Sequence, residues 1–201
     1  MTQTIAVADY GSGNLHSVSR AIARVGGSAL VTRDAREIAA ADALVIPGVG
    51  HFGACMRAIC RHGIDRAIED FRATGRPVFG VCVGMQVLFE GSDEDDEPGL
   101  GVLPGRVERL TGDVKVPHMG WNTATIISSH PYLEGLADGT RFYFVHSFAS
   151  AVGETALAAT THGVTFAAAV ARDNVFATQF HPEKSGDAGL HVYERLVRSL
   201  A

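Results

Sequence analysis

The segment Pro77–Met85 reads PVFGVCVGM and joins a short apolar run to a helical pattern. The run Pro77–Val81 is typical of a buried strand, and Met85, Leu88 and Phe89 recur at the spacing of one helix face. A strand that passes through a tight turn into a helix is a unit of layered α/β proteins. The segment therefore favours an α/β fold.

The residues before this segment continue the same alternation. Strands are expected at Thr4–Asp9, Ser28–Thr32 and Ala43–Ile46, where apolar residues are concentrated. Apolar residues at helical spacing predict helices around Leu15–Val25 and Ile64–Phe71. Strands that alternate with helices predict helices packed on a central sheet.

The residues after about position 100 have a different pattern, with many strand candidates and little helix between them. We expect them to form an antiparallel or mixed extension of the same sheet, and the chain to form one domain over residues 1–201. A final amphipathic helix is expected over Tyr193–Leu200. The strand candidates are Val102–Leu110, Ala124–Ser128, Arg141–Ser147, Thr155–Thr160, Val164–Ala171 and Val175–Phe180.

The composition is that of a globular protein with a sizeable core. Of 201 residues, 46% are hydrophobic and 19% charged, and 17 Lys and Arg face 22 Asp and Glu, giving a formal charge of −5. The negative charge argues against a nucleic-acid-binding surface, and no apolar run is long enough for a membrane span. Three cysteines are too few for a disulfide framework, so a soluble cytoplasmic protein with reduced thiols is expected.

The strongest candidate for chemistry is Cys82. It stands between Gly80 and Gly84 in the pattern G-x-C-x-G, a cysteine version of the nucleophile elbow. The small residues permit a tight turn that places the sulfur at a helix N-terminus, where the dipole favours a thiolate. The alternative, a buried structural cysteine between two glycines, fits the motif about as well.

A cysteine nucleophile needs a base, and His181 is the candidate. Alternate residues of an extended backbone project to the same side, so His181 and Glu183 can both face the nucleophile. Glu183 would then hold one ring nitrogen while the other meets the thiol. Taken alone, the segment fits a surface His-Pro turn with an exposed acid better, and only the presence of Cys82 favours the catalytic role.

Two further segments require interpretation. The loop Pro47–Gly50 follows an expected strand, and its N–H groups could face a developing negative charge, although a simple turn has the same residues. The acidic run Asp93–Glu97 favours a solvated loop over a cation site, because it lacks the alternating spacing of a calcium loop. Cys55 and Cys60, five residues apart on an expected helix, do not share a face, and no metal-binding spacing is present.

Several stretches together resemble the class I glutamine amidotransferases and, within them, the glutaminase subunits of imidazole glycerol phosphate synthases of histidine biosynthesis. The resemblance runs from the first expected strand to the last expected helix. The Cys82 elbow and the His181-x-Glu183 pair are shared by the wider superfamily. The matching stretches are Asp9–Leu15, Pro47–Gly50, Gly80–Gln86, Pro117–Asn122, Tyr143–Ser147 and Gln179–Gly186.

The resemblance implies a three-layer, flavodoxin-like α/β fold with a central mixed, mostly parallel sheet and an antiparallel extension. It implies glutamine hydrolysis by the triad Cys82, His181 and Glu183, without a cofactor or a metal. The oxyanion would be held by the N–H of Val83 and by one from Val49 or Gly50. Implied substrate contacts are Gln86, Ser147 and Phe148.

The resemblance also implies a partner. Such subunits dock on a (β/α)₈-barrel cyclase as a heterodimer and deliver ammonia to it. Candidate docking residues are Asn14, Trp121 and Lys184, whose ordinary alternatives are a helix cap, a core aromatic and a solvated cation. Two positions depart from the family pattern, Val83 where Leu is common and Phe148 where Tyr is common.

Three other functions remain open on the sequence. The chain could be a glutaminase of another synthase, a silent binding module of the same fold, or a cysteine peptidase or chaperone of the same superfamily. The stretches Asp9–Leu15 and Pro117–Asn122 favour the histidine pathway over another synthase. The complete set of Cys82, His181 and Glu183 argues against the other two.

Overall fold

The computed structural model describes residues 3–200. A nine-stranded sheet runs through it in the order β2-β1-β3-β4-β13-β12-β11-β8-β9. The first five strands in this order are parallel, and each later strand is antiparallel to its neighbour. Their bounds are β1 Thr4–Ala8, β2 Ser28–Thr32, β3 Ala43–Gly48, β4 Val78–Cys82, β8 His118–Ile126, β9 Thr140–His146, β11 Ala156–His162, β12 Val164–Arg172 and β13 Val175–Thr178.

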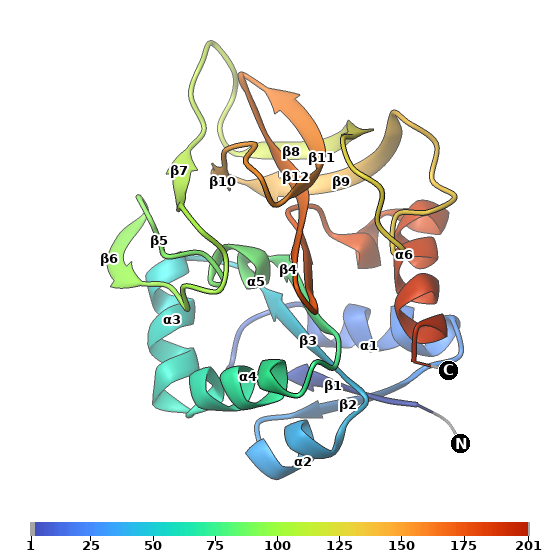
Figure 1. The fold of residues 1–201 in the computed structure, drawn as a ribbon. Helices are drawn as coiled ribbons and strands as arrows, with labels where there is room; N and C mark the ends of the chain where they lie inside the picture. Colours follow the sequence, from blue (N-terminus) through green and yellow to red (C-terminus); the bar gives the residue numbers. More distant parts are fainter. Residues whose placement is uncertain (1–2, 201) are drawn as a thin grey trace.

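Helices cover the two faces of the parallel part of the sheet (Figure 1). Helices α1 and α6 pack together on one face, and α3 and α4 lie on the other. The helices are α1 Leu15–Arg24, α2 Ala35–Ala40, α3 Phe52–Arg61, α4 Ile64–Ala73, α5 Val83–Gln86 and α6 Gly186–Arg198, with a short 3₁₀ turn η1 at Pro182–Lys184. This arrangement confirms the expected α/β fold with a mixed sheet.

The core lies where the helices meet the sheet. Every residue of β3 and β4 is buried, because helices shield both faces of these strands. The helices bury one stripe each, as Val18 and Ile22 do on α1. The carboxyl ends of β3 and β4 and the segment after β13 meet at one edge of the parallel part, and this edge holds the candidate site.

The prediction of one long strand over Val102–Leu110 is wrong. Only β7 Arg106–Arg109 forms there, and it belongs to a second, four-stranded sheet with β5 Gly91–Ser92, β6 Asp95–Pro98 and β10 Phe148–Ser150. The backbone N–H groups of Val102 and Leu103 both donate to the carbonyl of Leu88 at 2.9 Å. These bonds hold the first part of the segment against the end of α5, so it cannot pair as a strand.

The acidic run is only partly a solvated loop. Glu94 accepts a hydrogen bond from the backbone N–H of Phe52 at 2.8 Å, which caps the start of α3. Asp95 pairs with Arg57 of the same helix at 3.3 Å. The run therefore joins the small sheet to α3. On that helix Cys55 is buried and Cys60 is exposed, as expected.

None of the helices formed by residues 3–200 has the length and apolar character needed to cross a lipid bilayer.

Candidate active site

Cys82 lies at a strained turn between β4 and α5. Its φ of 55° is in the left-handed region, which is unfavourable for a residue with a Cβ. A Cβ on Gly84 would lie 1.8 Å from the carbonyl oxygen of Ile46, and one on Gly80 would lie 2.7 Å from that of Gly84. Only glycine fits at these two positions, so the sequence pattern forms the elbow that it predicts.

His181 and Glu183 meet by a different backbone path from the expected one. His181 Nδ1 lies 2.8 Å from Glu183 Oε1, and both side chains are 1% exposed. The expectation that extended backbone places them on one side is wrong, because Glu183 lies in the 3₁₀ turn η1 that begins at Pro182. This turn curls Glu183 back beneath the imidazole.

The electrostatic environment of His181 couples it to the thiol. Its Nε2 atom is buried and makes no hydrogen bond within residues 3–200, the sulfur of Cys82 included. Burial alone would lower the pKa of His181, but the nearby charge of Cys82, with further contributions from Glu183, raises this pKa to about 10. The imidazolium is thus the favoured form when the thiolate is beside it.

The sulfur of Cys82 has two polar neighbours besides His181. The amide Nε2 of Gln179 donates to it at 3.7 Å, and the carbonyl of Val145 on β9 lies 3.8 Å away. Cys82 is only 2% exposed, so the surrounding segments cover the sulfur. Gln179 was not singled out as a site residue from the sequence, although it begins the stretch Gln179–Gly186 that carries the family resemblance.

Hydrogen bonds from Ser12 and Tyr10 hold the loop Pro47–Gly50 in place. The hydroxyl of Ser12 donates to the carbonyl of Val49 at 2.6 Å and accepts the N–H of Val49 at 3.4 Å. The hydroxyl of Tyr10 donates to the carbonyl of Pro47. Gly50 has a φ of 92°, and Val49 is exposed. In this arrangement the N–H of Val49 is bonded to Ser12.

The three residues implied as substrate contacts lie at one place. Gln86 on α5 is buried. Its Nε2 donates to the carbonyl of Phe148 at 2.8 Å and to Gln179 Oε1 at 3.1 Å. Ser147 is the bend between β9 and β10, directly before Phe148. Gln86 therefore reaches the backbone of the 147–148 segment across the site.

The candidate docking residues have varied surroundings. Trp121 is 49% exposed on β8, so the alternative of a core aromatic is wrong for it. Lys184 lies over the ring of Tyr143, with its Nζ 5.8 Å from the ring centroid. Asn14 is the N-cap residue of α1, as its alternative role predicts, although its side chain makes no capping bond. Met119, which is 64% exposed, was missed by sequence reasoning.

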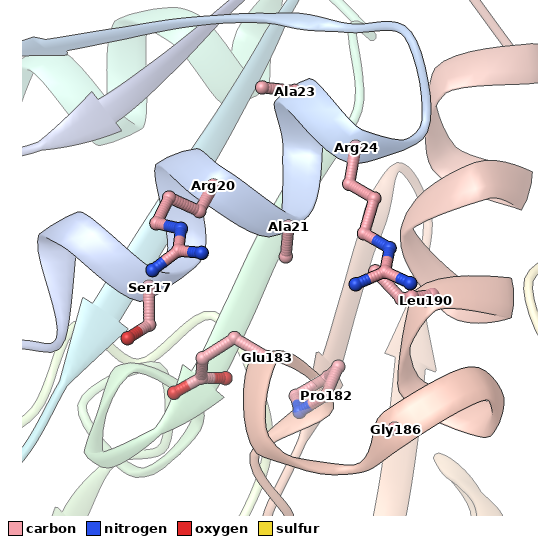
Figure 2. A pocket seen from close by; sticks show the side chains of 9 residues that line it. All are labelled: Ser17, Arg20, Ala21, Ala23, Arg24, Pro182, Glu183, Gly186 and Leu190. Atoms are coloured by element: carbon pink, nitrogen blue, oxygen red, sulfur yellow. The ribbon is translucent and has the colours of Figure 1, made fainter.

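A surface hollow of about 590 Å³ lies behind the His181–Glu183 pair. Figure 2 shows the carboxylate of Glu183 on its floor, facing α1, with Ser17 and Arg20 above it. Cys82 does not line this hollow. The hollow is therefore separate from the place where a substrate would meet the sulfur.

A cysteine at a strand-to-helix elbow, with a buried His–Glu pair next to it, defines the class of cysteine-dependent amidotransferases built on a parallel α/β sheet. The glutamine amidotransferase class-I family matches residues 6–197. Solved structures agree on the fold. PurLQS from Thermotoga maritima has a TM-score of 0.77 at 18% identity, over 100% of both chains. A glutamine amidotransferase structure has a TM-score of 0.75 at 24% identity, over 96% of this chain and 98% of the other.

Curated relatives are closer in sequence, and each of three is an imidazole glycerol phosphate synthase subunit HisH. The Chromobacterium violaceum protein is 46% identical over 96% of both chains, the Thermobifida fusca protein 45% over 100%, and the Mycolicibacterium paratuberculosis protein 48% over 99%. The chain therefore belongs to the HisH family of class I glutamine amidotransferases. This confirms the expectation of a glutaminase subunit in histidine biosynthesis.

Proposed function

We propose that this chain hydrolyses the side-chain amide of L-glutamine to L-glutamate and ammonia, with Cys82 as nucleophile. The observation that carries the proposal is the buried contact of His181 with Glu183 beside the strained Cys82 elbow. A positioned acid–base pair next to a thiol is the arrangement that acyl transfer through a thioester requires.

The steps follow from these three side chains. The Cys82 thiolate attacks the amide carbon, and the C–N bond breaks while the His181 imidazolium gives its proton to the leaving ammonia. The product is a γ-glutamyl thioester. Neutral His181 then takes a proton from water, the resulting hydroxide attacks the thioester, and the C–S bond breaks to release glutamate. Glu183 stabilises the charged imidazole and fixes its orientation throughout.

The tetrahedral intermediates need donors for their oxyanion. The N–H of Val83 is the first in α5, directly after the nucleophile, and is one proposed donor. The second would come from Val49 or Gly50. Because Ser12 already accepts the N–H of Val49, this N–H must leave the hydroxyl before it can serve the oxyanion. The proposed subunit is therefore slow until the loop is released.

Substrate access requires a similar release. Cys82 is almost fully covered, so glutamine reaches the sulfur only when neighbouring segments move. Both N–H bonds of Gln86 are directed to Phe148 and Gln179, which leaves its Oε1 for a substrate N–H. We assign the α-amino and carboxylate ends of glutamine to the backbone at Ser147 and Phe148.

The proposed partner is a (β/α)₈-barrel cyclase that uses the ammonia, and its docking surface is the exposed face of β8 and β9. Met119 and Trp121 project from this face, and Tyr143 is the register partner of Trp121. The carbonyl of Tyr143 accepts the N–H of His181 at 2.9 Å. A partner on this face would close over the site and retain the ammonia. Lys184, which lies over the ring of Tyr143, extends the proposed face, and Asn14 at the start of α1 stays a docking candidate from the sequence alone.

The docking surface is tested with Trp121→Ala, compared with Ile127→Ala. Both side chains are 49% exposed, but Ile127 lies beyond the far end of β8. We expect only Trp121→Ala to weaken binding to the cyclase, by about tenfold or more, since buried aromatic anchors dominate interfaces. Equal binding by both variants in calorimetry would place the partner elsewhere.

The nucleophile is tested by covalent trapping. A diazoketone analogue of glutamine, supplied to the complex with the cyclase, should alkylate the peptide that contains Cys82. Cys82→Ala should remain unlabelled, although Cys55 and Cys60 are still present. Labelling of another residue, or of Cys82→Ala to the same extent, would contradict the proposal.

A further inference from the structure

A buried chain of hydrogen bonds connects two histidines on neighbouring strands to the sulfur of Cys82. His118 on β8 and His146 on β9 are direct register partners. Their nitrogens His118 Nδ1 and His146 Nε2 lie 3.1 Å apart, and His146 Nδ1 lies 2.9 Å from the carbonyl oxygen of Phe148. That oxygen also receives the amide of Gln86.

The carbonyl of Phe148 fixes the direction of every bond in the chain, because it can only accept. His146 must therefore carry its proton on Nδ1, which leaves Nε2 as an acceptor when the ring is neutral. His118 must then donate from its own Nδ1 and accept at Nε2. Asn122 supplies that donor, with Nδ2 at 3.2 Å from His118 Nε2 and 3.0 Å from the carbonyl of Thr161.

The carbonyl of Phe148 also determines the orientation of the side-chain amides of Gln86 and Gln179. Gln86 must turn its NH₂ group toward Phe148, so the same group meets Gln179 Oε1 at 3.1 Å. The NH₂ group of Gln179 is therefore left facing Cys82 Sγ, at 3.7 Å. Gln179 is fully buried, and a donor in this position stabilises a thiolate in preference to a thiol.

The charge state of the two histidines agrees with this assignment. Burial lowers the pKa of His118 to about 4 and that of His146 to about 3. Both rings are neutral at neutral pH, so each has one donor and one acceptor nitrogen. An exposed histidine that gains and loses a proton near neutral pH would not keep one ring nitrogen as the donor and the other as the acceptor.

We infer that His118, His146 and Gln86 are positioning residues that hold the Gln179 amide as a hydrogen-bond donor to the nucleophilic sulfur of Cys82. The inference rests on the proposed function, since it gives the thiolate of that mechanism a fixed donor. The chain begins on β8, whose opposite face is the proposed docking surface. Gln179 would then be a catalytic residue, because it contacts the reacting atom.

The test compares variants that remove one hydrogen-bond donor of the chain with variants that retain it. Gln179→Glu keeps the shape and still accepts from Gln86, but offers no N–H to the sulfur. His146→Asn retains a donor near the position of Nδ1, whereas His146→Gln places its amide near Nε2 and loses that donor. His162→Phe is the control, because His162 stacks on His118 at 4.2 Å between ring centroids but takes no part in the chain.

The readouts are alkylation of Cys82 by iodoacetamide across pH, in a Cys60→Ser background, and kcat and KM for glutamine in the complex with the cyclase. We expect Gln179→Glu and His146→Gln to displace the alkylation profile to higher pH and to lower kcat by roughly fivefold or more. Each variant loses a hydrogen bond, and Gln179→Glu also adds a carboxylate beside the sulfur, so His146→Gln is the variant that isolates the hydrogen bond. His162→Phe should remain near the unsubstituted protein, with an unchanged melting temperature. His146→Asn, which keeps the donor to Phe148 but loses the acceptor for His118, should retain more of kcat than His146→Gln.

Two results would overturn the inference. One is an alkylation profile and kcat that Gln179→Glu leaves unchanged. The other is an equal loss in His146→Asn and His146→Gln, which would indicate a packing role. Should the variants fail to fold, ¹⁵N spectra of histidine-labelled native protein still decide, since Nε2–H tautomers for His118 and His146 would contradict the chain. Failure of the proposed function can be told apart from failure of this inference, because in the first case the unsubstituted complex would release no glutamate.

Discussion

Nδ1 of His181 lies 2.8 Å from Oε1 of Glu183, and neither side chain is exposed by more than 1%. The contact is formed within one 3₁₀ turn, so its geometry depends on three consecutive residues after β13. In the proposed mechanism a carboxylate held this way fixes the ring for proton transfer with the sulfur of Cys82. We therefore expect the reactivity of Cys82 to depend on Glu183 as much as on the elbow.

Glu183→Gln should lower kcat for glutamine by about 10²-fold or more, because the amide cannot stabilise the imidazolium. The control is Glu194→Gln, which removes an exposed ion pair with Arg198. Steady-state glutamate release by the complex measures the effect. If both variants retained full kcat, Glu183 would have no role in the reaction.

Gly84→Ala should destabilise the fold by about 3 kcal/mol, since its Cβ would overlap the carbonyl of Ile46. Gly153→Ala is the matched control, because a Cβ there meets nothing within 4 Å. Urea unfolding of the two variants compares the free energies. A Gly84→Ala protein as stable as the control would mean that the elbow is looser than described.

Ser12→Ala should raise glutamate release by the isolated subunit, by about tenfold, because it frees the N–H of Val49. Ser19→Ala removes a hydroxyl that bonds only within α1, and should have no such effect. The rates of the two variants without the cyclase decide the question. A fall in activity on Ser12→Ala would show that the observed loop is already the active form.

Stability should fall steeply on acidification because of His118 and His146. Burial holds their pKa values at about 4 and 3, below the unfolded value of about 6.5, so the unfolded chain binds more protons in this window. Their contribution is complete above about pH 6.5 and is lost as the pH falls, by at most about 1.4 kcal/mol per pH unit for each ring.

Replacing both rings by Gln should flatten this acid dependence, whereas His162→Phe should retain it. Chemical unfolding at a series of pH values gives the slope for each protein. An equal slope in the doubly substituted protein would assign the acid sensitivity to other groups.

Local patterns in the sequence predicted much of the site. The spacing of Gly80 and Gly84 around Cys82 was sufficient for the elbow, because the turn depends only on neighbouring residues. The alternation of strands and helices predicted helices packed on a central sheet for the same reason, whereas the mostly parallel strand order was implied only by the family resemblance. The organisation as one domain over residues 1–201 and the cytoplasmic location stay predictions.

Features that depend on strand register could not be predicted from local patterns. His118 and His146 meet because β8 and β9 pair in one register, and the sequence does not specify that register. The same pairing places Trp121 on the exposed face. The four-stranded sheet was not predicted, because Val102 and Leu103 bond to the end of α5 instead of continuing the expected strand. No local sequence pattern indicates this contact.

In the proposed function, Cys82 cleaves the side-chain amide of glutamine and the partner receives the ammonia. The most direct measurement is glutamate release by the complex of this chain with the cyclase and its nucleotide substrate, for the native chain and for Cys82→Ala. We predict rapid release by the native complex and none by Cys82→Ala, which should still bind the cyclase and still support product formation from added ammonia. Undiminished glutamate release by the Cys82→Ala complex would contradict the account.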